Sequence, residues 1–229
     1  MKLRRLFLTL LLIVFGICLS AQTSDDASRQ KLPWRPPTGQ DRFIVEFHND
    51  GFLNLAPEME TRPYSPGINA HIFYDYPFAK KSIFSFAWGY GFSSFNVHHN
   101  GEFLEDSLKI TQFVPFPKDY NYSKNKASNN FLEIPIELRI RTRGLRQFKM
   151  AFGAKAGYVV NVHTKIIDDG GKRKAYQIPN LMKYRYGLTA KIGVGRFMLH
   201  GFYSLTPFLE ENNGPELIPF TLGCRVNLL

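Results

Sequence analysis

Residues 131–142 read Phe-Leu-Glu-Ile-Pro-Ile-Glu-Leu-Arg-Ile-Arg-Thr, with an apolar residue at every second position. The apolar positions are Leu132, Ile134, Ile136, Leu138 and Ile140, and those between them are Glu133, Pro135, Glu137, Arg139 and Arg141. A period of two indicates a β-strand with one apolar and one polar face. The stretch therefore predicts a strand that lies between two different environments.

The same alternation recurs along the chain, and no stretch has a convincing helical period. Eight strands are expected, at about residues 42–53, 68–77, 83–93, 131–142, 148–165, 185–194, 197–206 and 218–228. Strands of soluble sandwiches are typically about 5–6 residues long, whereas a membrane strand needs about 9–11. The lengths favour an all-β, eight-stranded, antiparallel up-and-down transmembrane β-barrel. The alternative is a secreted soluble sandwich or a lipocalin-like barrel.

The links between these strands alternate between short and long. The short links are 79–82, 144–147 and 195–196, and the long links are 56–67, 97–130, 166–184 and 207–217. Outer-membrane barrels have short periplasmic turns and longer extracellular loops. A two-residue turn at Gly195-Arg196 would pair Val194 with Phe197, Ile192 with Leu199 and Leu188 with Tyr203, so that apolar residues meet on one face.

The chain has 229 residues, a formal charge of +10, 15% aromatic residues and only two cysteines. This composition excludes a disordered chain and a disulfide scaffold. The mean hydropathy of −0.21 argues against a helical membrane bundle. The basic residues are scattered singly and form no basic helix, so no nucleic-acid partner is expected.

Three segments are expected. Residues 1–21 resemble a secretory signal peptide, because Lys2, Arg4 and Arg5 precede an apolar core. An N-terminal membrane anchor is the alternative. Residues 22–40 read as a flexible, polar, Pro-rich leader, and residues 41–229 as the barrel domain. Export and a membrane barrel together predict the bacterial outer membrane.

Two stretches carry a family resemblance. Residues 132–138, Leu-Glu-Ile-Pro-Ile-Glu-Leu, resemble the LEIPL-type strand of PorT-like outer-membrane β-barrel proteins. Residues 214–223 are similar to the last hairpin of that family. The resemblance covers residues 41–229 and implies an eight-stranded barrel of OmpA/OmpX-like architecture. The family's namesake is linked to type IX secretion and most relatives have no assigned role, so the resemblance offers an accessory role in a type IX secretion or gliding-type envelope complex as an alternative function.

The polar face of the expected barrel carries charges of both signs. They are Glu46, Asp75, Glu133, Glu137, Arg139, Lys155, Lys191 and Arg225. An eight-stranded barrel has room only for side chains, and buried charges must be paired. These residues are therefore expected to form a structural charge network without an open pore, with Glu137 near Lys155 or Arg141. A conduit for ions or protons is the alternative.

Four further polar residues are candidates for metal binding or catalysis. His48 and His71 are expected on neighbouring strands beside Glu46 and Asp75, which allows a metal site or an acid–base pair. His200 and Ser204 are spaced too far apart along a strand for a direct hydrogen bond. We therefore expect no catalytic, cofactor or metal site and no enzyme. A lipid-modifying outer-membrane enzyme is kept as an alternative.

The expected 97–130 loop contains aromatic residues next to Pro115 and Pro117. They are Phe113, Phe116, Tyr120 and Tyr122. Exposed aromatics would form a contact surface, and packed aromatics would cover the barrel mouth. The function expected is a structural or interaction module. Its expected partners are outer-membrane lipid and lipopolysaccharide, and other envelope proteins; the sequence does not predict the oligomeric state. Lys172, Arg173 and Lys174 in the expected 166–184 loop could touch lipopolysaccharide or could simply be solvated.

Overall fold

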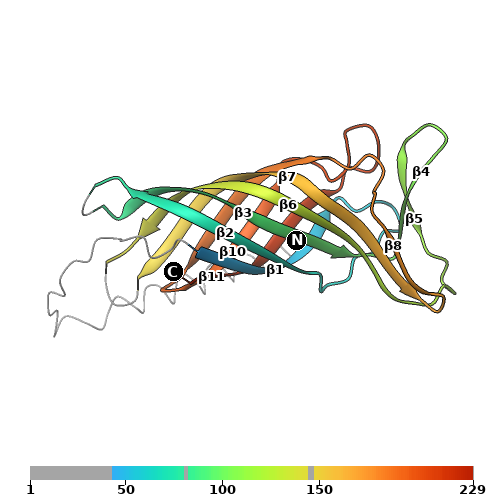
Figure 1. The fold of residues 1–229 in the computed structure, drawn as a ribbon, viewed down its shortest axis with the longest axis horizontal. Coiled ribbons are helices and arrows are strands. Elements are labelled where there is room, and N and C mark those ends of the chain that lie inside the picture. Colours follow the sequence, from blue (N-terminus) through green and yellow to red (C-terminus); the bar gives the residue numbers. More distant parts are fainter. Residues whose placement is uncertain (1–42, 80–81, 144–146, 229) are drawn as a thin grey trace, which may run out of the picture. The chain divides into compact units, whose positions relative to one another are not determined.

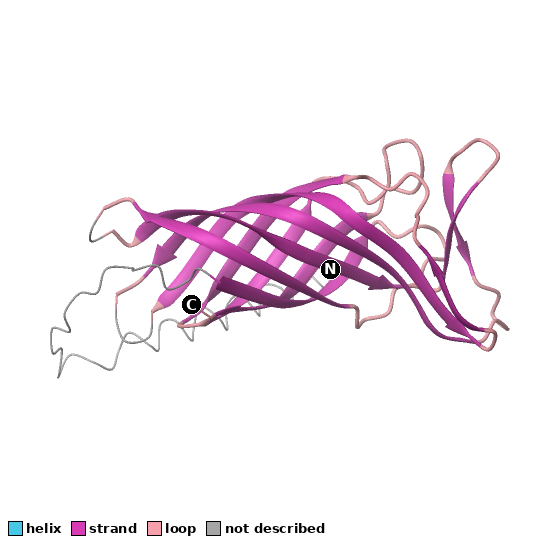
Figure 2. Ribbon diagram, in the orientation of Figure 1, coloured by secondary structure: helices cyan, strands magenta, loops and turns pink. Residues whose placement is uncertain are grey.

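The computed structural model describes residues 43–79, 82–143 and 147–228. All the regular structure in these ranges is β-strand (Figures 1 and 2). Within the same ranges, no helix has the length and hydrophobicity to cross a membrane. The expected signal peptide and leader lie outside the described residues and remain predictions.

Eight long strands close into a ring. They are β1 (Phe43–Leu53), β2 (Pro66–Pro77), β3 (Phe84–His98), β6 (Tyr122–Arg141), β7 (Phe148–Asp168), β9 (Tyr184–Val194), β10 (Phe197–Ser204) and β11 (Ile218–Asn227). The order is β6-β3-β2-β1-β11-β10-β9-β7, and β6 also pairs with β7. Every pair is antiparallel. The predicted eight-stranded antiparallel barrel is confirmed.

The turn between β9 and β10 fixes the register predicted from the sequence. Val194 is opposite Phe197, Ile192 opposite Leu199 and Leu188 opposite Tyr203. Gly195 has a φ of 62°, a left-handed conformation that a residue without a Cβ adopts readily. The two-residue turn and the apolar pattern therefore specify the same pairing.

The two faces of the barrel wall are the reverse of those of a soluble protein. On β6, the outward side chains of Leu132 and Ile134 are 58% and 60% exposed, whereas the inward side chain of Glu133 is 2% exposed. Outward aromatics lie near both ends of the strands, with Tyr74 stacked on Trp88 at 5.1 Å and Tyr158 5.3 Å from Tyr184. This is the pattern of a wall that faces lipid, with aromatic side chains at the interfaces.

The short and long connections lie at opposite ends of the ring. Both ends of the described chain, Phe43 and Leu228, lie with the short connections, at what we name the turn end. The opposite end, where the links 54–65, 99–121, 169–183 and 205–217 lie, is named the loop end.

The loop end contains more β-structure than expected. The predicted 97–130 loop includes the end of β3, the hairpin of β4 (Gly101–Glu105) and β5 (Thr111–Pro115), and the first residues of β6. The predicted 166–184 loop includes the end of β7 and β8 (Gly171–Ala175), which pairs with β7. These segments have polar residues on both faces, so they lack the apolar alternation that marks a membrane strand. We name the region of residues 94–130 and 159–175 the extension; it comprises these strand segments and the turns that connect them (Figure 1).

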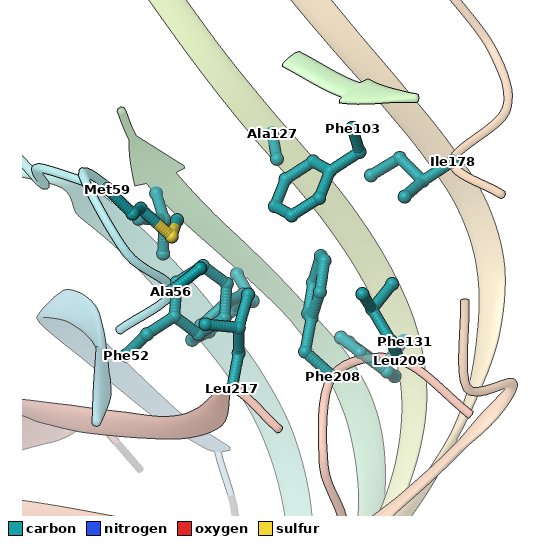
Figure 3. Packing of buried hydrophobic residues seen from close by; sticks show 12 residues of the cluster. Phe52, Ala56, Met59, Phe103, Ala127, Phe131, Ile178, Phe208, Leu209 and Leu217 are labelled. Atoms are coloured by element: carbon teal, nitrogen blue, oxygen red, sulfur yellow. The ribbon is translucent and has the colours of Figure 1, made fainter. Parts of the chain in front are cut away.

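A hydrophobic cluster, named the cap, fills the loop end (Figure 3). Its residues are Phe52, Ala56, Met59, Phe95, Val97, Phe103, Ala127, Phe131, Ile178, Phe208, Leu209 and Leu217. The Phe208 ring lies 4.8 Å from the Phe52 ring and 5.7 Å from the Phe103 ring. The cap thus joins strands of the ring to the β4–β5 hairpin and to the loop before β11.

Candidate functional site

Glu137 is the centre of the charged lumen. Its carboxylate accepts hydrogen bonds from Arg139 Nε at 2.7 Å, Lys191 Nζ at 2.5 Å and Arg225 Nη1 at 2.9 Å. These donors come from β6, β9 and β11, and all four side chains are at most 4% exposed. One carboxylate therefore binds cations from three strands.

Glu46 continues the network toward the loop end. Lys191 Nζ lies 3.1 Å from Glu46 Oε1, so this lysine links the carboxylates of Glu46 and Glu137. Asn69 donates to Glu46 at 2.8 Å and is also 2.9 Å from His48 Nε2. His48 Nδ1 in turn lies 2.9 Å from Asp50.

Glu133 holds a second group of cations. It lies 3.0 Å from Lys155 Nζ, 2.5 Å from Arg185 Nη2 and 3.4 Å from His71 Nε2. The Arg185 guanidinium also lies over the Phe131 ring, 3.7 Å from its centroid. Arg185 therefore connects the charged lumen to the cap.

The structure places all eight predicted interior residues in the lumen, but the partners of Glu137 differ from those expected. Lys155 pairs with Glu133, and Arg141 pairs with Asp75 at 2.5 Å. Glu137 is opposite Gly153 on the neighbouring strand and reaches across the narrow lumen to β9 and β11. The expected partners belong to the β6–β7 hairpin, whereas Lys191 and Arg225 reach Glu137 from across the lumen.

Three further lumen residues were not singled out from the sequence. Asn69 bridges Glu46 and His48, Arg185 pairs with Glu133, and Phe73 packs under Arg139 at 4.4 Å. Arg185 stands on the polar stripe of its strand, so the alternation alone could have included it. Asn69 and Phe73 carry no comparable signal.

The polar groups considered for catalysis are separated. Ser204 donates a hydrogen bond to the Thr206 carbonyl at 2.8 Å, whereas His200 Nε2 lies 3.7 Å from Glu46. Asp75 pairs with Arg141, away from His48 and His71. Across residues 43–79, 82–143 and 147–228, no three His, Cys, Asp or Glu side chains are arranged to hold a metal ion.

The lumen side chains leave only small cavities in the two places where space remains between them. A cavity beside Arg139, Lys149 and Arg225 has a volume of about 10 Å³, and another beside Phe95 and Arg185 also has about 10 Å³. Each has room for at most about one water molecule. Larger hollows lie elsewhere: about 540 Å³ on the lipid-facing wall beside Phe152 and Leu188, about 380 Å³ beside Tyr176, and about 220 Å³ beside His99.

The four predicted aromatic contact residues occupy two places in the extension, and all four are half-buried. Phe113 packs beside Phe103 under the β4–β5 hairpin, at 5.4 Å, next to the cap. Phe116 lies 4.7 Å from Tyr120 and 5.1 Å from Tyr122, and these three form a separate aromatic cluster.

Tyr120 attaches this aromatic cluster to the β7–β8 hairpin. Its hydroxyl donates to Asp168 and accepts a hydrogen bond from Arg173 at 2.6 Å. Arg173 also contacts Asp168 at 2.7 Å. The hydrogen bond from Tyr120 lowers the pKa of Asp168, and the same bond raises the pKa of Tyr120.

His99 is a buried histidine in the extension. It lies edge-on to Phe103 and Phe113, at 5.3 and 5.7 Å, and Asn125 donates to its Nδ1 at 3.2 Å. Burial lowers the pKa of His99 from 6.5 to about 4. The imidazole is therefore neutral near pH 7.

The sequence of this closed, charged and lipid-faced barrel matches one family model, described as outer membrane protein beta-barrel domain, over residues 44–210. The chain belongs to this family. This outer-membrane barrel has no match among the curated proteins. Among solved structures it is similar to Ail, the attachment invasion locus protein of Yersinia pestis, with 12% identity, a TM-score of 0.32, and coverage of 81% of this chain and 95% of that chain.

The family places the barrel in the bacterial outer membrane. By the arrangement usual in such barrels, the turn end is periplasmic and the loop end is extracellular. The charged lumen then lies at the level of the lipid, and the cap and extension lie at the outer surface.

Proposed function

We propose that this protein is a non-enzymatic outer-membrane barrel without an open pore that acts as a structural or interaction module through its extension. The observation that carries the proposal is the packed lumen: Glu46, Glu133 and Glu137 each bind cations across it. A filled barrel offers no path for a solute, so its working surface lies outside the lumen.

The proposed contact surface combines two parts of the extension. One is the Phe116–Tyr120–Tyr122 cluster. The other is the outer face of the β4–β5 hairpin, where Leu104 and Val114 are 47% and 42% exposed. Apolar side chains exposed above the membrane are typical of a surface that meets a partner protein.

The finer proposal, from the resemblance to PorT-like barrels, is an accessory subunit of a secretion or gliding-type envelope complex. Unlike an autonomous barrel, such a subunit requires a stoichiometric protein partner in the envelope. The same experiment therefore separates the two.

The test is affinity purification of the tagged full chain from gently solubilised outer membranes, with co-purifying proteins quantified. The wild type is compared with the triple variant Leu104→Ser/Leu108→Ser/Val114→Ser, in which all three residues are exposed. The control is Tyr64→Ser/Tyr176→Ser, at exposed positions elsewhere at the loop end. We expect a stoichiometric envelope protein with the wild type and the control, and its loss with the triple variant.

A clean monomer, or a partner retained by the triple variant, would contradict an interaction role for the hairpin. A folded barrel migrates faster on a denaturing gel before boiling than after, so this shift verifies that each variant is folded. A change in lipid composition that depends on His200 would instead support the enzyme alternative.

A further inference from the structure

Five lysines stand on the outer face of the extension. They are Lys124 and Lys126 on β6, Lys165 on β7, and Lys172 and Lys174 on β8. The residues between them, such as Asn125 and Ile166, point inward and are buried. We name these five the lysine patch.

The strand register places lysines directly opposite one another. Lys165 is opposite Lys126 on one side and Lys174 on the other, and His98 is opposite Lys126 on the next strand. Side chains that are directly opposite have Cβ atoms about 4.5–5.5 Å apart, and like charges in such pairs are destabilising. A row of three ammonium groups across three strands is therefore unfavourable in the absence of an anion.

The protein supplies little compensation for this charge. Among the residues that the structure describes, no ion pair includes any of the five lysines, and Lys126 donates to the Asn96 amide oxygen at 2.8 Å. Asp168, the acid at the adjacent hairpin, is held by Tyr120 and Arg173. Burial together with Lys124, Lys165 and Lys174 lowers the pKa of Lys126.

The patch continues the lipid-facing wall of the barrel. Lys126 has the same orientation as Leu132, six positions away on β6, and Leu132 is the last exposed apolar residue of that stripe. Six residues of strand span about 20 Å, which at a tilt of about 40° is about 15 Å along the membrane normal. The patch therefore lies on the extracellular side of the headgroup layer of the outer leaflet, directly above the lipid-facing wall.

We propose that the lysine patch binds the phosphate groups of lipopolysaccharide. The ligand chemistry is a cluster of phosphates, which lysine ammonium groups recognise as point charges. The position of the patch identifies a lipid as the source of these phosphates. The wall below the patch faces acyl chains, and anionic headgroups attract basic side chains at the membrane surface. The proposal rests on the proposed function, since both place the working surface on the extension.

The experiment uses the folded full chain in neutral detergent, titrated with purified lipopolysaccharide and with the same lipid after enzymatic dephosphorylation. The test variant is Lys126→Gln/Lys165→Gln/Lys174→Gln. The charge-matched control is Lys109→Gln/Lys118→Gln/Lys183→Gln, whose lysines are exposed elsewhere on the protein. Inorganic phosphate is added as a competitor to distinguish a free anion from a lipid headgroup.

We expect the test variant to bind lipopolysaccharide at least about tenfold more weakly than the wild type and the control. Dephosphorylation should weaken binding to the wild type by a similar factor, as should raised salt. Equal affinity of the test variant, or of the dephosphorylated lipid, would overturn the proposal. Displacement by inorganic phosphate at equal phosphate concentration would overturn the assignment to a lipid.

This test is independent of the partner experiment, because the substituted lysines are not on the β4–β5 hairpin. Failure of lipopolysaccharide binding would leave the capture of a protein partner unchanged. Loss of the partner in the hairpin variant would leave the lysine patch intact.

Discussion

The lumen and the cap are both buried, but they are built from opposite kinds of residue. The lumen holds Glu137, Glu133 and Glu46, each in contact with cations at 3.1 Å or less. The cap holds apolar side chains such as Phe52 and Phe208, packed ring against ring. Two regions of one barrel thus exclude water by different interactions.

The difference follows from what each region adjoins. The lumen lies behind a wall whose outer face is already apolar, so the alternation leaves polar side chains inside, and these must pair with one another. The cap adjoins water at the outer surface, where burial of apolar area is itself favourable. Pairing therefore stabilises the middle of this barrel, and hydrophobic packing closes its mouth.

The largest expected effect comes from removing the central charge of the lumen. Glu137→Gln leaves Arg139, Lys191 and Arg225 without their shared carboxylate. Breaking one buried pair costs about 3–5 kcal/mol, and because three cations are affected we expect about 5 kcal/mol. Urea titration in lipid vesicles measures the free energy of unfolding, with the exposed Glu105→Gln as control. A loss below about 1 kcal/mol would contradict the pairing account.

The cap should respond to loss of volume. Phe208→Ala removes the ring that contacts Phe52 and Phe103, and we expect a loss of about 3–4 kcal/mol from lost burial and the remaining cavity. The same urea titration measures it. The control is Leu108→Ala, at a position that is 78% exposed, where a change of about 0.5 kcal/mol or less is expected. Equal effects at the two positions would show that the cap is not packed.

Acid should loosen the extension before the lumen. The pKa of buried His99 is about 4 in the folded protein and about 6.5 when exposed, so the opened state binds more protons between these values. Stability is therefore complete above pH 6.5 and falls as the pH falls toward 4, by up to about 3 kcal/mol of local opening free energy. The protection factors of the β4–β5 amides, which correct hydrogen-exchange rates for the intrinsic pH dependence of exchange, should fall over this range.

His99→Gln removes this titration, so its protection factors should change much less with pH. Unchanged protection factors of the wild-type hairpin between pH 7 and pH 4.5 would contradict a buried neutral imidazole. An equal fall in the protection factors of β9 and β10 would show that acid acts on the whole barrel.

The smallest expected effect tests whether the two regions are independent. Glu137 and Phe208 share no contact among those described. The double variant Glu137→Gln/Phe208→Ala should therefore lose the sum of the two single losses, within about 0.5 kcal/mol. A larger coupling energy in the same urea titrations would mean that the lumen and the cap form one cooperative unit.

The sequence predicts the ring of eight strands but not the side-chain contacts across its lumen. Alternation in 131–142 predicted β6, and the Gly195-Arg196 turn predicted the pairing of Val194 with Phe197. Both signals are local, because a strand has a fixed period and a tight turn fixes the register. The partners of Glu137 depend on which strands face each other across the lumen, which the stagger of all eight strands determines.

Most of the extension was predicted as loops for a related reason, although residues 159–165 belonged to the predicted strand 148–165. Residues such as Lys124 and Asn125 are both polar, yet they stand on opposite faces of β6. Outside the lipid, a strand can carry polar groups on either face, so the alternation that reveals a membrane strand is lost. Pairing with β7 and β3, rather than a sequence pattern, holds these residues in strands.

Ionic conductance of the purified, folded full chain in planar lipid bilayers tests directly whether the lumen is packed. The Lys and Arg side chains that pair with Glu46, Glu133 and Glu137 fill the lumen. The wild type should therefore produce no unitary conductance steps. Reproducible wild-type steps, at protein amounts verified as folded by the gel shift, would contradict the packed lumen and with it the proposal that this barrel works only through its outer surface.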